Sequence, residues 1–505
     1  MATSEIKPTS TCTEDVDTEK HAKAIDTTHT DEAMKVLLTY EGDREWDASE
    51  EAKVLRKIDL KLMPILCLTY GVQFYDKGLL SQAALFGIRQ DLNLNSKDRY
   101  SFAASIFYLG FIAGCYPVIV MAQRFPLERV AFAIVFLWGG CMALTAACTD
   151  WRGLFVQRFF LGVLEAGVSP MFMMLVGGWY KKDEQAFRMG WWYCFTGFTL
   201  LLSPLVNWGL GHATGALASW QYMYLFAGCL TVLWSFCILF FLPPDPIRAH
   251  GFTERERFII VSRMQSNNSG VRNTHFKWNQ AIELLIDIKF WTLFVITILT
   301  NNTNGLASTY LPIVIAGLGF SPFVSILLLI PIGFSTGAGQ LFLTFLASRF
   351  PNRRTLLMAV FQLQVMLAAL LAWLLPRPSS GGRLFAMFIV WGFSASYAIS
   401  MGVSIANTAG YTKRSLSSAG LFIAYCLGNF VGPLTFQAKD APEYTKAFII
   451  VFVFSAAAAA LSLVYGWLCV RQNKARDATG TMEGFEHAYE DDLTDQKNPQ
   501  FRYTT

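Results

Sequence analysis

The sequence has 505 residues, of which 53% are hydrophobic and only 15% are charged. Soluble domains carry about 25% charged residues, so this deficit excludes an ordinary soluble protein and indicates one that lies mostly in a lipid bilayer. The formal net charge of +4 gives no indication of a nucleic-acid partner. The ten cysteines form no CxxC pair, so we expect neither a disulfide framework nor a zinc site.

Twelve apolar stretches are predicted to cross the membrane as helices. Each is long enough to span a hydrocarbon core of about 30 Å. They lie at 60–88, 101–122, 130–149, 153–176, 188–211, 222–242, 288–318, 323–347, 355–375, 383–409, 416–437 and 447–470. The first 57 residues are polar and lack the apolar core of a signal peptide, so we expect a disordered tail. Residues 243–287 form the longest polar connection, and residues 471–505 form a second polar tail, also expected to be disordered.

The orientation follows from the lysines and arginines that flank the spans. An even number of spans places both termini on one side, and the side with more Lys and Arg is cytoplasmic. The two tails, the central loop 243–287 and the short loops on their side carry this excess, so both termini are predicted to be cytoplasmic. The short loops contribute Arg124, Arg129, Arg349, Arg353, Arg354, Lys413 and Arg414. These residues are either parts of a cytoplasmic gate or plain topology signals.

The chain also repeats itself at a nearly constant spacing. Ile58-Asp59-Leu60-Lys61 before the first span recurs as Ile286-Asp287-Ile288-Lys289 before the seventh. Arg124-Phe-Pro-Leu-Glu-Arg129 after the second span recurs as Arg349-Phe-Pro-Asn-Arg-Arg354 after the eighth. The predicted fold class is therefore an all-α membrane protein of two parallel six-helix repeats, residues 58–242 and 288–470, with any substrate site between them.

Four ionisable residues lie well inside the spans, and all are in the first half. They are Asp76 and Lys77 in the first span, and Arg158 and Glu165, two turns apart, in the fourth. Charges inside a bilayer are costly, so they need partners or a function. Asp76 and Glu165 are candidates for proton coupling, and Lys77 and Arg158 for binding an anion. The alternatives are that the four charges form salt bridges that hold the two spans together, or that the Arg158 side chain extends to the outer lipid headgroups.

Polar side chains in the second half supply further candidates for substrate binding. The run Asn301-Asn302-Thr303-Asn304-Gly305 interrupts the seventh span, where Gly305 could break the helix. Candidates there and in later spans are Asn302, Asn304, Tyr397, Asn407 and Asn429. The alternative for each is a hydrogen bond between helices, which is the commoner use of such residues.

Several motifs resemble a known family. The fourth span reads Arg158-x-x-x-Gly162-x-x-Glu165-Ala-Gly167-x-x-Pro170, and Trp179-Tyr180-Lys-Lys-x-Glu184 follows it. Asn407-x-x-Gly410-x-Thr412-Lys413-Arg414 and Gly428-Asn429-x-x-Gly432-Pro433 also match. Over roughly residues 55–470 the chain resembles the fungal allantoate-permease-like anion:cation symporters of the major facilitator superfamily. One departure is Tyr75-Asp76-Lys77-Gly78-Leu79, where the family pattern has Leu-Asp-Arg-x-Asn.

This resemblance implies a plasma-membrane transporter that takes up a small organic anion or vitamin together with a proton. An internal membrane such as the vacuole is an alternative location. Proton-driven efflux of a metabolite or xenobiotic is the alternative function, and a nutrient sensor is a further one. No phosphate-binding loop, metalloprotease motif or nucleophile elbow occurs, so we expect no enzyme activity, no cofactor and no metal. The expected driving force is the proton gradient. The expected partners are a small molecule and the lipid bilayer, with no nucleic acid and no obligate protein partner.

Overall fold

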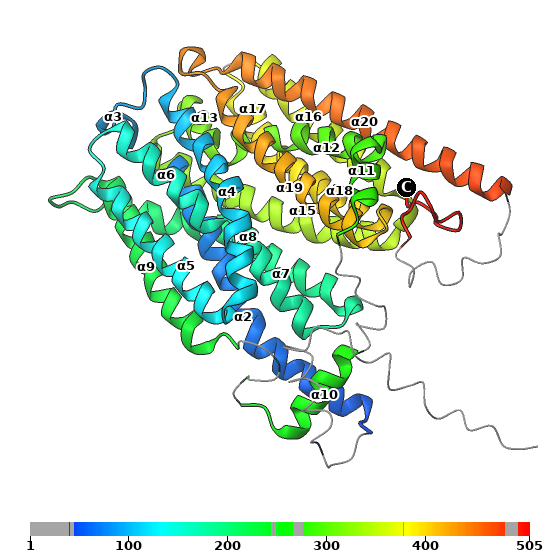
Figure 1. The fold of residues 1–505 in the computed structure, drawn as a ribbon. Helices are drawn as coiled ribbons and strands as arrows, with labels where there is room; N and C mark the ends of the chain where they lie inside the picture. Colours follow the sequence, from blue (N-terminus) through cyan, green and yellow to red (C-terminus); the bar gives the residue numbers. More distant parts are fainter. Residues whose placement is uncertain are drawn as a thin grey trace, which may run out of the picture.

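The computed structural model describes residues 45–243, 251–265, 276–376, 378–479 and 493–505, together with Tyr40, Pro246 and Ala249. Every regular element in this part of the chain is helical (Figure 1). The predicted all-α class is confirmed.

The first six spans form one bundle, the N-half. Inside lipid an apolar segment can satisfy its backbone hydrogen bonds only as a helix, which is why each apolar stretch became one. The spans are α2 (Ala48–Ala83), α4 (Arg99–Arg124), α5 (Leu127–Leu144), α6 (Trp151–Glu165) with α7 (Val168–Trp179), α8 (Lys182–Gly211) and α9 (Ser219–Phe241). Two short helices lie in connections, α3 (Ile88–Asp91) and η1 (Thr145–Ala147).

The last six spans form the C-half, in which several spans are broken into two or three pieces. They are α12 (Ile288–Asn302) with the π-helix η3 (Gly305–Tyr310) and α13 (Leu311–Gly317), α14 (Pro322–Leu327) with α15 (Leu329–Arg349), α16 (Arg354–Leu374), α17 (Ser380–Ile389) with α18 (Gly392–Asn407), α19 (Tyr411–Leu434) and α20 (Thr445–Thr479). Short turns of 3-10 helix, η4 (Pro351–Arg353) and η5 (Ala438–Asp440), lie in two of the connections. Between the halves lie α10 (Glu254–Gln265) and α11 (Trp278–Ile286).

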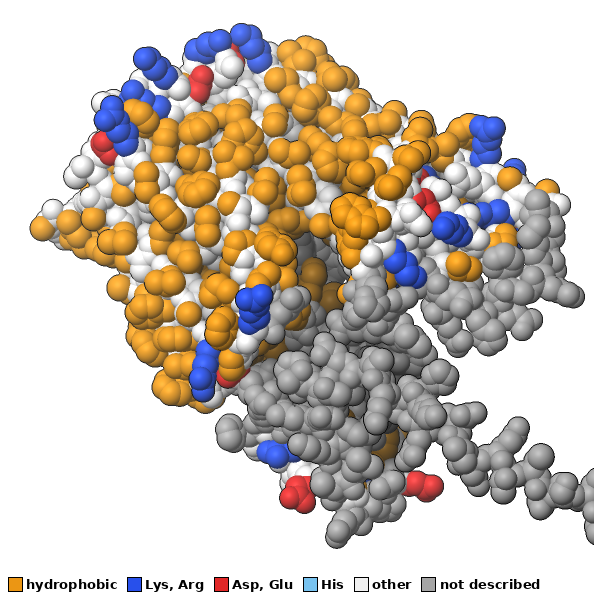
Figure 2. All heavy atoms as spheres, in the orientation of Figure 1, with side chains coloured by type: hydrophobic (Ala, Val, Ile, Leu, Met, Phe, Trp, Pro, Cys, Tyr) orange, Lys and Arg blue, Asp and Glu red, His pale blue; other side chains and the backbone are white. Residues whose placement is uncertain are grey.

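The surface has the apolar belt of a membrane protein. Ten helices among the described residues are long and apolar enough to cross a bilayer. The remaining two spans are α2, which carries Asp76 and Lys77 in its last third, and the broken span α12–η3–α13. The predicted twelve spans are therefore confirmed. Figure 2 shows hydrophobic side chains over the middle of one face, with Lys and Arg gathered towards its ends.

The two ends of the bundle differ. The tail side holds the start of α2, the helices α10 and α11, the end of α20 and the described C-terminal residues (Figure 1). The loop side holds the turns between α2 and α4, α8 and α9, α13 and α14, and α19 and α20. Arg124-Phe-Pro and Arg349-Phe-Pro lie at matching places on the tail side, after α4 and after α15.

Two boundaries differ from the predictions. The helix α2 begins at Ala48, inside the segment expected to be disordered, because Glu50 and Glu51 of its first turn form ion pairs with Arg255, Lys181 and Arg263. The second tail is ordered in part, since α20 continues to Thr479 and residues 493–505 pack on the C-half. The rest of the first predicted tail, apart from Tyr40 and residues 45–47, lies outside the described residues.

The halves meet closely on the loop side and in the middle of the bundle. The Tyr100 hydroxyl donates to the Thr309 carbonyl at 2.9 Å, and the Ser105 hydroxyl donates to the Phe430 carbonyl at 2.7 Å. The halves also meet where α8 of the N-half packs against α15 of the C-half. These two helices approach so closely that a Cβ on Gly197 would lie 2.9 Å from the Cα of Gly337. On the tail side two separate clusters of ion pairs form, one in each half.

Candidate functional site

Three of the four charged residues inside the spans are buried in the N-half, and each has a neutral hydrogen-bond partner. The Thr231 hydroxyl of α9 donates to Asp76 at 3.0 Å, and the Arg158 guanidinium donates to the Tyr224 hydroxyl at 2.6 Å. The Gln73 amide donates to the Glu165 backbone carbonyl at 3.2 Å and more weakly to its carboxylate at 3.4 Å. No ion pair within 4.0 Å joins these charges to one another in the described part of the chain.

These buried groups are incompletely satisfied. One carboxylate oxygen of Asp76, one of Glu165 and the Nε of Arg158 have no hydrogen-bond partner. Asp76 and Glu165 are both fully buried. A buried carboxylate without a cation at bonding distance is costly as an anion and much less so as a neutral acid. The arrangement therefore suits carboxyl groups that bind and release a proton.

The Lys77 side chain does not join the buried group of Asp76, Arg158 and Glu165, although Lys77 follows Asp76 directly on α2. Its side chain reaches between the halves, where its ammonium lies 5.2–5.3 Å from the ring centroids of Phe107, Tyr108 and Phe111 and 6.0 Å from that of Tyr425. Ring faces attract a cation, by about 0.5–2 kcal/mol each. No carboxylate of the described residues lies within ion-pairing distance of the ammonium. The ammonium thus lies inside the membrane region with no carboxylate of the described residues in direct contact, although its charge acts on Glu165 from a longer distance.

A cavity lies between the halves beside this ammonium. Its volume is about 50 Å³, enough for water but not for a vitamin-sized molecule. The walls come from α2 on one side and from η3, α15 and the spans around Trp391 and Tyr425 on the other. Its polar lining residues are Lys77, Ser81, Gln82, Asn304, Ser308 and Tyr425.

The opposite wall is shaped by the irregularity in the seventh span. α12 ends at Asn302, and a π-helix begins at Gly305. The position requires glycine because a Cβ there would lie 2.2 Å from the carbonyl carbon of Gly432 in α19. This close approach lets the amide of Asn304 donate to the side-chain oxygen of Asn429, whose own amide donates to the Tyr425 carbonyl at 2.8 Å. The predicted irregularity at Gly305 is present, but the helix changes there from α to π and does not break.

Comparison with known proteins agrees with this architecture. A family model described as the Major Facilitator Superfamily matches residues 66–433. The chain belongs to the major facilitator superfamily. The allantoate permease of Saccharomyces cerevisiae is 31% identical, over 94% of this chain and 90% of the permease. The thiamine pathway transporter of the same yeast is also 31% identical, over 89% of this chain and 86% of that transporter.

The fold is also similar to that of a solved transporter. A bacterial homolog of the human lysosomal transporter Spinster, in an inward-facing and unoccupied conformation, has a TM-score of 0.63 at 16% identity. The match covers 84% of this chain and 99% of the bacterial one. The predicted resemblance to fungal allantoate-permease-like members of the superfamily is confirmed, and the chain is a transporter of the secondary type.

In this member of the superfamily the predicted site residues fall into separate places. Lys77 and Asn304 line the cavity, Asn429 contacts Asn304, and Tyr397 stacks on Tyr425 with ring centroids 5.2 Å apart. The cavity lining does not include Asn302, which is buried with both of its amide atoms unpartnered.

Asn407 and the loop cations lie at the tail side. The Asn407 amide donates to the Tyr465 hydroxyl at 3.0 Å and to the Thr504 carbonyl at 2.9 Å, far along α18 from Trp391. Lys413 is buried in an ion-pair cluster, and Arg354 is half-buried. The other predicted loop residues are exposed at the surface; they are Arg124, Arg129, Arg349, Arg353 and Arg414.

The sequence reasoning missed the aromatic residues around Lys77. Phe107, Tyr108 and Phe111 occupy neighbouring positions on one side of α4, in a span rich in apolar residues. Nothing in their spacing distinguishes them from residues that pack against lipid or another helix. Gln82 and Ser308, which also line the cavity, were not selected either.

Proposed function

We propose that this transporter imports a small organic anion together with a proton, by alternating access, across the fungal plasma membrane with both termini in the cytoplasm. The observation that carries the proposal is the ammonium of Lys77. It lies at the cavity between the halves, surrounded by aromatic rings, and has no carboxylate partner among the described residues.

An anionic substrate would supply the missing partner. A carboxylate bound to Lys77 would form a charge-assisted bond in a region of low dielectric, where such bonds are strong. Asn304, Ser308 and Asn429 on the facing half could then hydrogen-bond the rest of the molecule. Because Lys77 belongs to the N-half and the amides to the C-half, the bound substrate would join the two halves and favour their closing around it.

The proton would bind to Asp76 or Glu165. The four intramembrane charges sum to zero when all are ionised, so protonation of one carboxylate leaves the N-half site with a net positive charge. That charge attracts an anion, and the loaded site is neutral again and suited to occlusion. Arg158, fixed by the Tyr224 hydroxyl, would keep the field around both carboxylates positive.

Two further observations support this proposal. The allantoate permease relative is named for a small carboxylate. The central cavity is too small for such a molecule as it stands, so the halves must move apart around Lys77 before one can enter, as alternating access requires. The close contacts of α4 with α19 and of α8 with α15 form the interfaces about which the two halves would rotate as rigid bodies.

The experiment that tests the proposal is uptake of radiolabelled carboxylates by cells that express this chain. A panel of ureides and vitamins is offered at outside pH 5 and pH 7, with and without a protonophore. Accumulation of one carboxylate that is faster at pH 5 and abolished by the protonophore supports import with a proton. No uptake at either pH, combined with lower cellular retention of a toxic metabolite, would contradict import and indicate efflux.

A further inference from the structure

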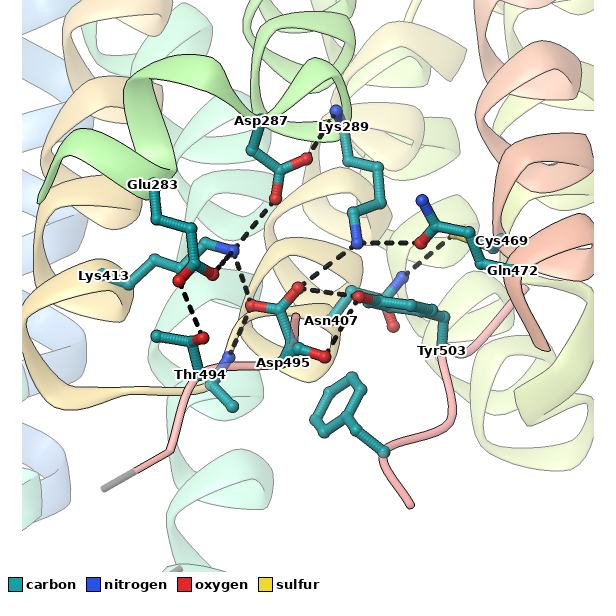
Figure 3. Close-up of polar contacts among 12 residues, drawn as sticks. Glu283, Asp287, Lys289, Asn407, Lys413, Cys469, Gln472, Thr494, Asp495 and Tyr503 are labelled. Carbon is teal, nitrogen blue, oxygen red and sulfur yellow. Dashed lines mark hydrogen bonds and ion pairs between the residues drawn. The ribbon is translucent and has the colours of Figure 1, made fainter. Parts of the chain in front are cut away.

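The described C-terminal residues 493–505, here called the C-terminal segment, pack against the tail side of the C-half. Figure 3 shows this segment passing beneath the ends of several helices. The Thr494 hydroxyl donates to Glu283 of α11 at 2.9 Å, and Asp495 forms an ion pair with Lys413 of α19 at 2.7 Å. The backbone amide of Arg354, at the start of α16, donates to the Thr505 carbonyl at 2.7 Å. The segment thus contacts elements that lie far apart in the sequence.

Asp495 is the central contact of the segment. Its carboxylate is fully buried between Lys413 and Lys289, whose ammonium lies 3.2 Å away, and the Tyr503 hydroxyl donates to it at 2.8 Å. Burial by itself would raise the pKa of Asp495, but the charges of Lys413 and Lys289 outweigh it and hold the pKa below its usual value. Lys413 also pairs with Glu283 and Asp287. The Lys289 ammonium has Asp495, the Gln472 side chain and the face of the Tyr503 ring around it.

A second set of contacts recognises the backbone at the end of the segment. The Asn407 side-chain oxygen accepts from the Thr504 amide at 2.8 Å, while its amide donates to the Thr504 carbonyl. Asn473 of α20 makes the same pair of bonds with the backbone of Tyr503, at 2.9 Å and 2.8 Å. Such paired bonds fix an extended peptide in one register, as an added strand is fixed by a sheet edge.

We propose that the tail-side face of the C-half is a peptide-binding site whose ligand is the chain's own C-terminal segment. Lys289 and Lys413 recognise the acidic side chain of Asp495, and Asn407 and Asn473 recognise the backbone of residues 503 and 504. Binding joins the tail-side ends of α11, α12, α18, α19 and α20, so the C-half moves as one rigid body during transport. Release of the segment removes the Asp495 carboxylate from Lys289 and from Lys413, although Lys413 keeps Glu283 and Asp287, and this loss favours the bound state.

The test uses the purified full chain and a chain that ends at Asp492, with thermal unfolding as the readout. We expect the shortened chain to unfold at a lower temperature, and a synthetic peptide of residues 493–505 to restore the midpoint in a saturable manner. A peptide with Asp495→Asn should bind at least about tenfold more weakly, because it removes the carboxylate that pairs with Lys289 and one of the three carboxylates that pair with Lys413. Equal melting of the two chains, or equal binding of the two peptides, would overturn the proposal.

A second measurement keeps the test decisive if the shortened chain does not fold. In the full chain, the amides of Tyr503 and Thr504 donate to Asn473 and Asn407, so their hydrogen exchange reports binding of the segment directly. Asp495→Asn should speed this exchange at least about tenfold. Glu254→Gln, which changes an exposed carboxylate on the first turn of α10, is the control and should leave it nearly unchanged. Unchanged exchange in Asp495→Asn would overturn the proposal whether or not the chain transports an anion.

Discussion

Asp76 and Lys77 are neighbours on α2, yet their side chains occupy separate environments. The carboxylate of Asp76 is buried inside the N-half against Thr231, whereas the ammonium of Lys77 lies between the halves among aromatic rings. Successive residues of an α-helix point about 100° apart, so one helix can separate the two groups while keeping them one residue apart. A proton on Asp76 would therefore change the electric field at Lys77 without contact between the proton and the substrate.

The first prediction concerns the proton. Asp76→Asn removes a group that can bind a proton but leaves Lys77 in place, so the anion should still bind. We expect the ratio of uptake rates at pH 5 and pH 7 to fall to about one, while exchange of labelled for unlabelled substrate across the membrane continues. Asp477→Asn, a change of an exposed carboxylate on the tail side, should retain the wild-type ratio.

The outcome distinguishes the two candidate carboxylates. If Asp76→Asn keeps its stimulation by acid and Glu165→Gln loses it, the proton binds to Glu165. If both variants keep it, neither buried carboxylate couples the proton, and that part of the account is wrong.

The second prediction concerns the contact between α19 and the irregularity in the seventh span. Gly305→Ala would place a Cβ 2.2 Å from the carbonyl carbon of Gly432 and 2.4 Å from the Pro433 nitrogen. Both are backbone atoms that cannot turn aside, so we expect a loss of about 1–3 kcal/mol in the free energy of unfolding. Gly402→Ala in α18 is the control, because a Cβ there meets nothing within 4 Å. Thermal unfolding of the purified variants measures the difference, and equal midpoints would show that the backbones do not approach this closely.

The third prediction concerns the tail-side ion pairs of the N-half. Burial alone would raise the pKa of Glu51, but bonds from Lys181, Trp46 and Arg263 outweigh it and lower that pKa to about 2. A carboxyl whose pKa is lower in the folded state stabilises the fold above its unfolded pKa of about 4.5, and this contribution is lost as the pH falls towards 2.

Glu51→Gln should therefore lower the unfolding temperature at pH 7, and the difference from the unchanged chain should shrink steadily below about pH 4.5. Glu254→Gln, on the exposed first turn of α10, should have little effect at any pH. A Glu51→Gln difference that stayed constant between pH 7 and pH 3 would contradict the lowered pKa.

The overall fold was predictable because few backbone conformations are stable inside a lipid bilayer. An apolar run of sufficient length must become a helix, and twelve such runs with repeated loop motifs predict two six-helix halves. The start of α2 was not predictable, because Glu50 and Glu51 are ordered by Arg255 and Arg263 of α10, about two hundred residues away in the sequence. A single sequence does not reveal such pairs.

The site was predictable only where polarity stands out against an apolar span. Lys77, Asn304 and Asn429 were selected for that reason, and the structure brings them to one region. The rings of Phe107 and Tyr108 are as apolar as their neighbours, so their role around Lys77 could not be read from the sequence. Asn407 is as polar as Asn304, but the C-terminal segment binds it at the tail side.

The central claim is that Lys77 holds the anion, and the most direct measurement is the KM of carboxylate uptake in Lys77→Met. Truncating one partner of a buried charge pair costs about 2–5 kcal/mol, so we expect KM to rise at least about 30-fold or saturable uptake to disappear. Lys77→Arg should retain part of the uptake, since it keeps the charge. The Lys77→Met protein should remain in the membrane and be at least as stable as the unchanged chain, because an unpaired charge has been removed from the apolar region. Uptake by Lys77→Met with an unchanged KM would contradict the account.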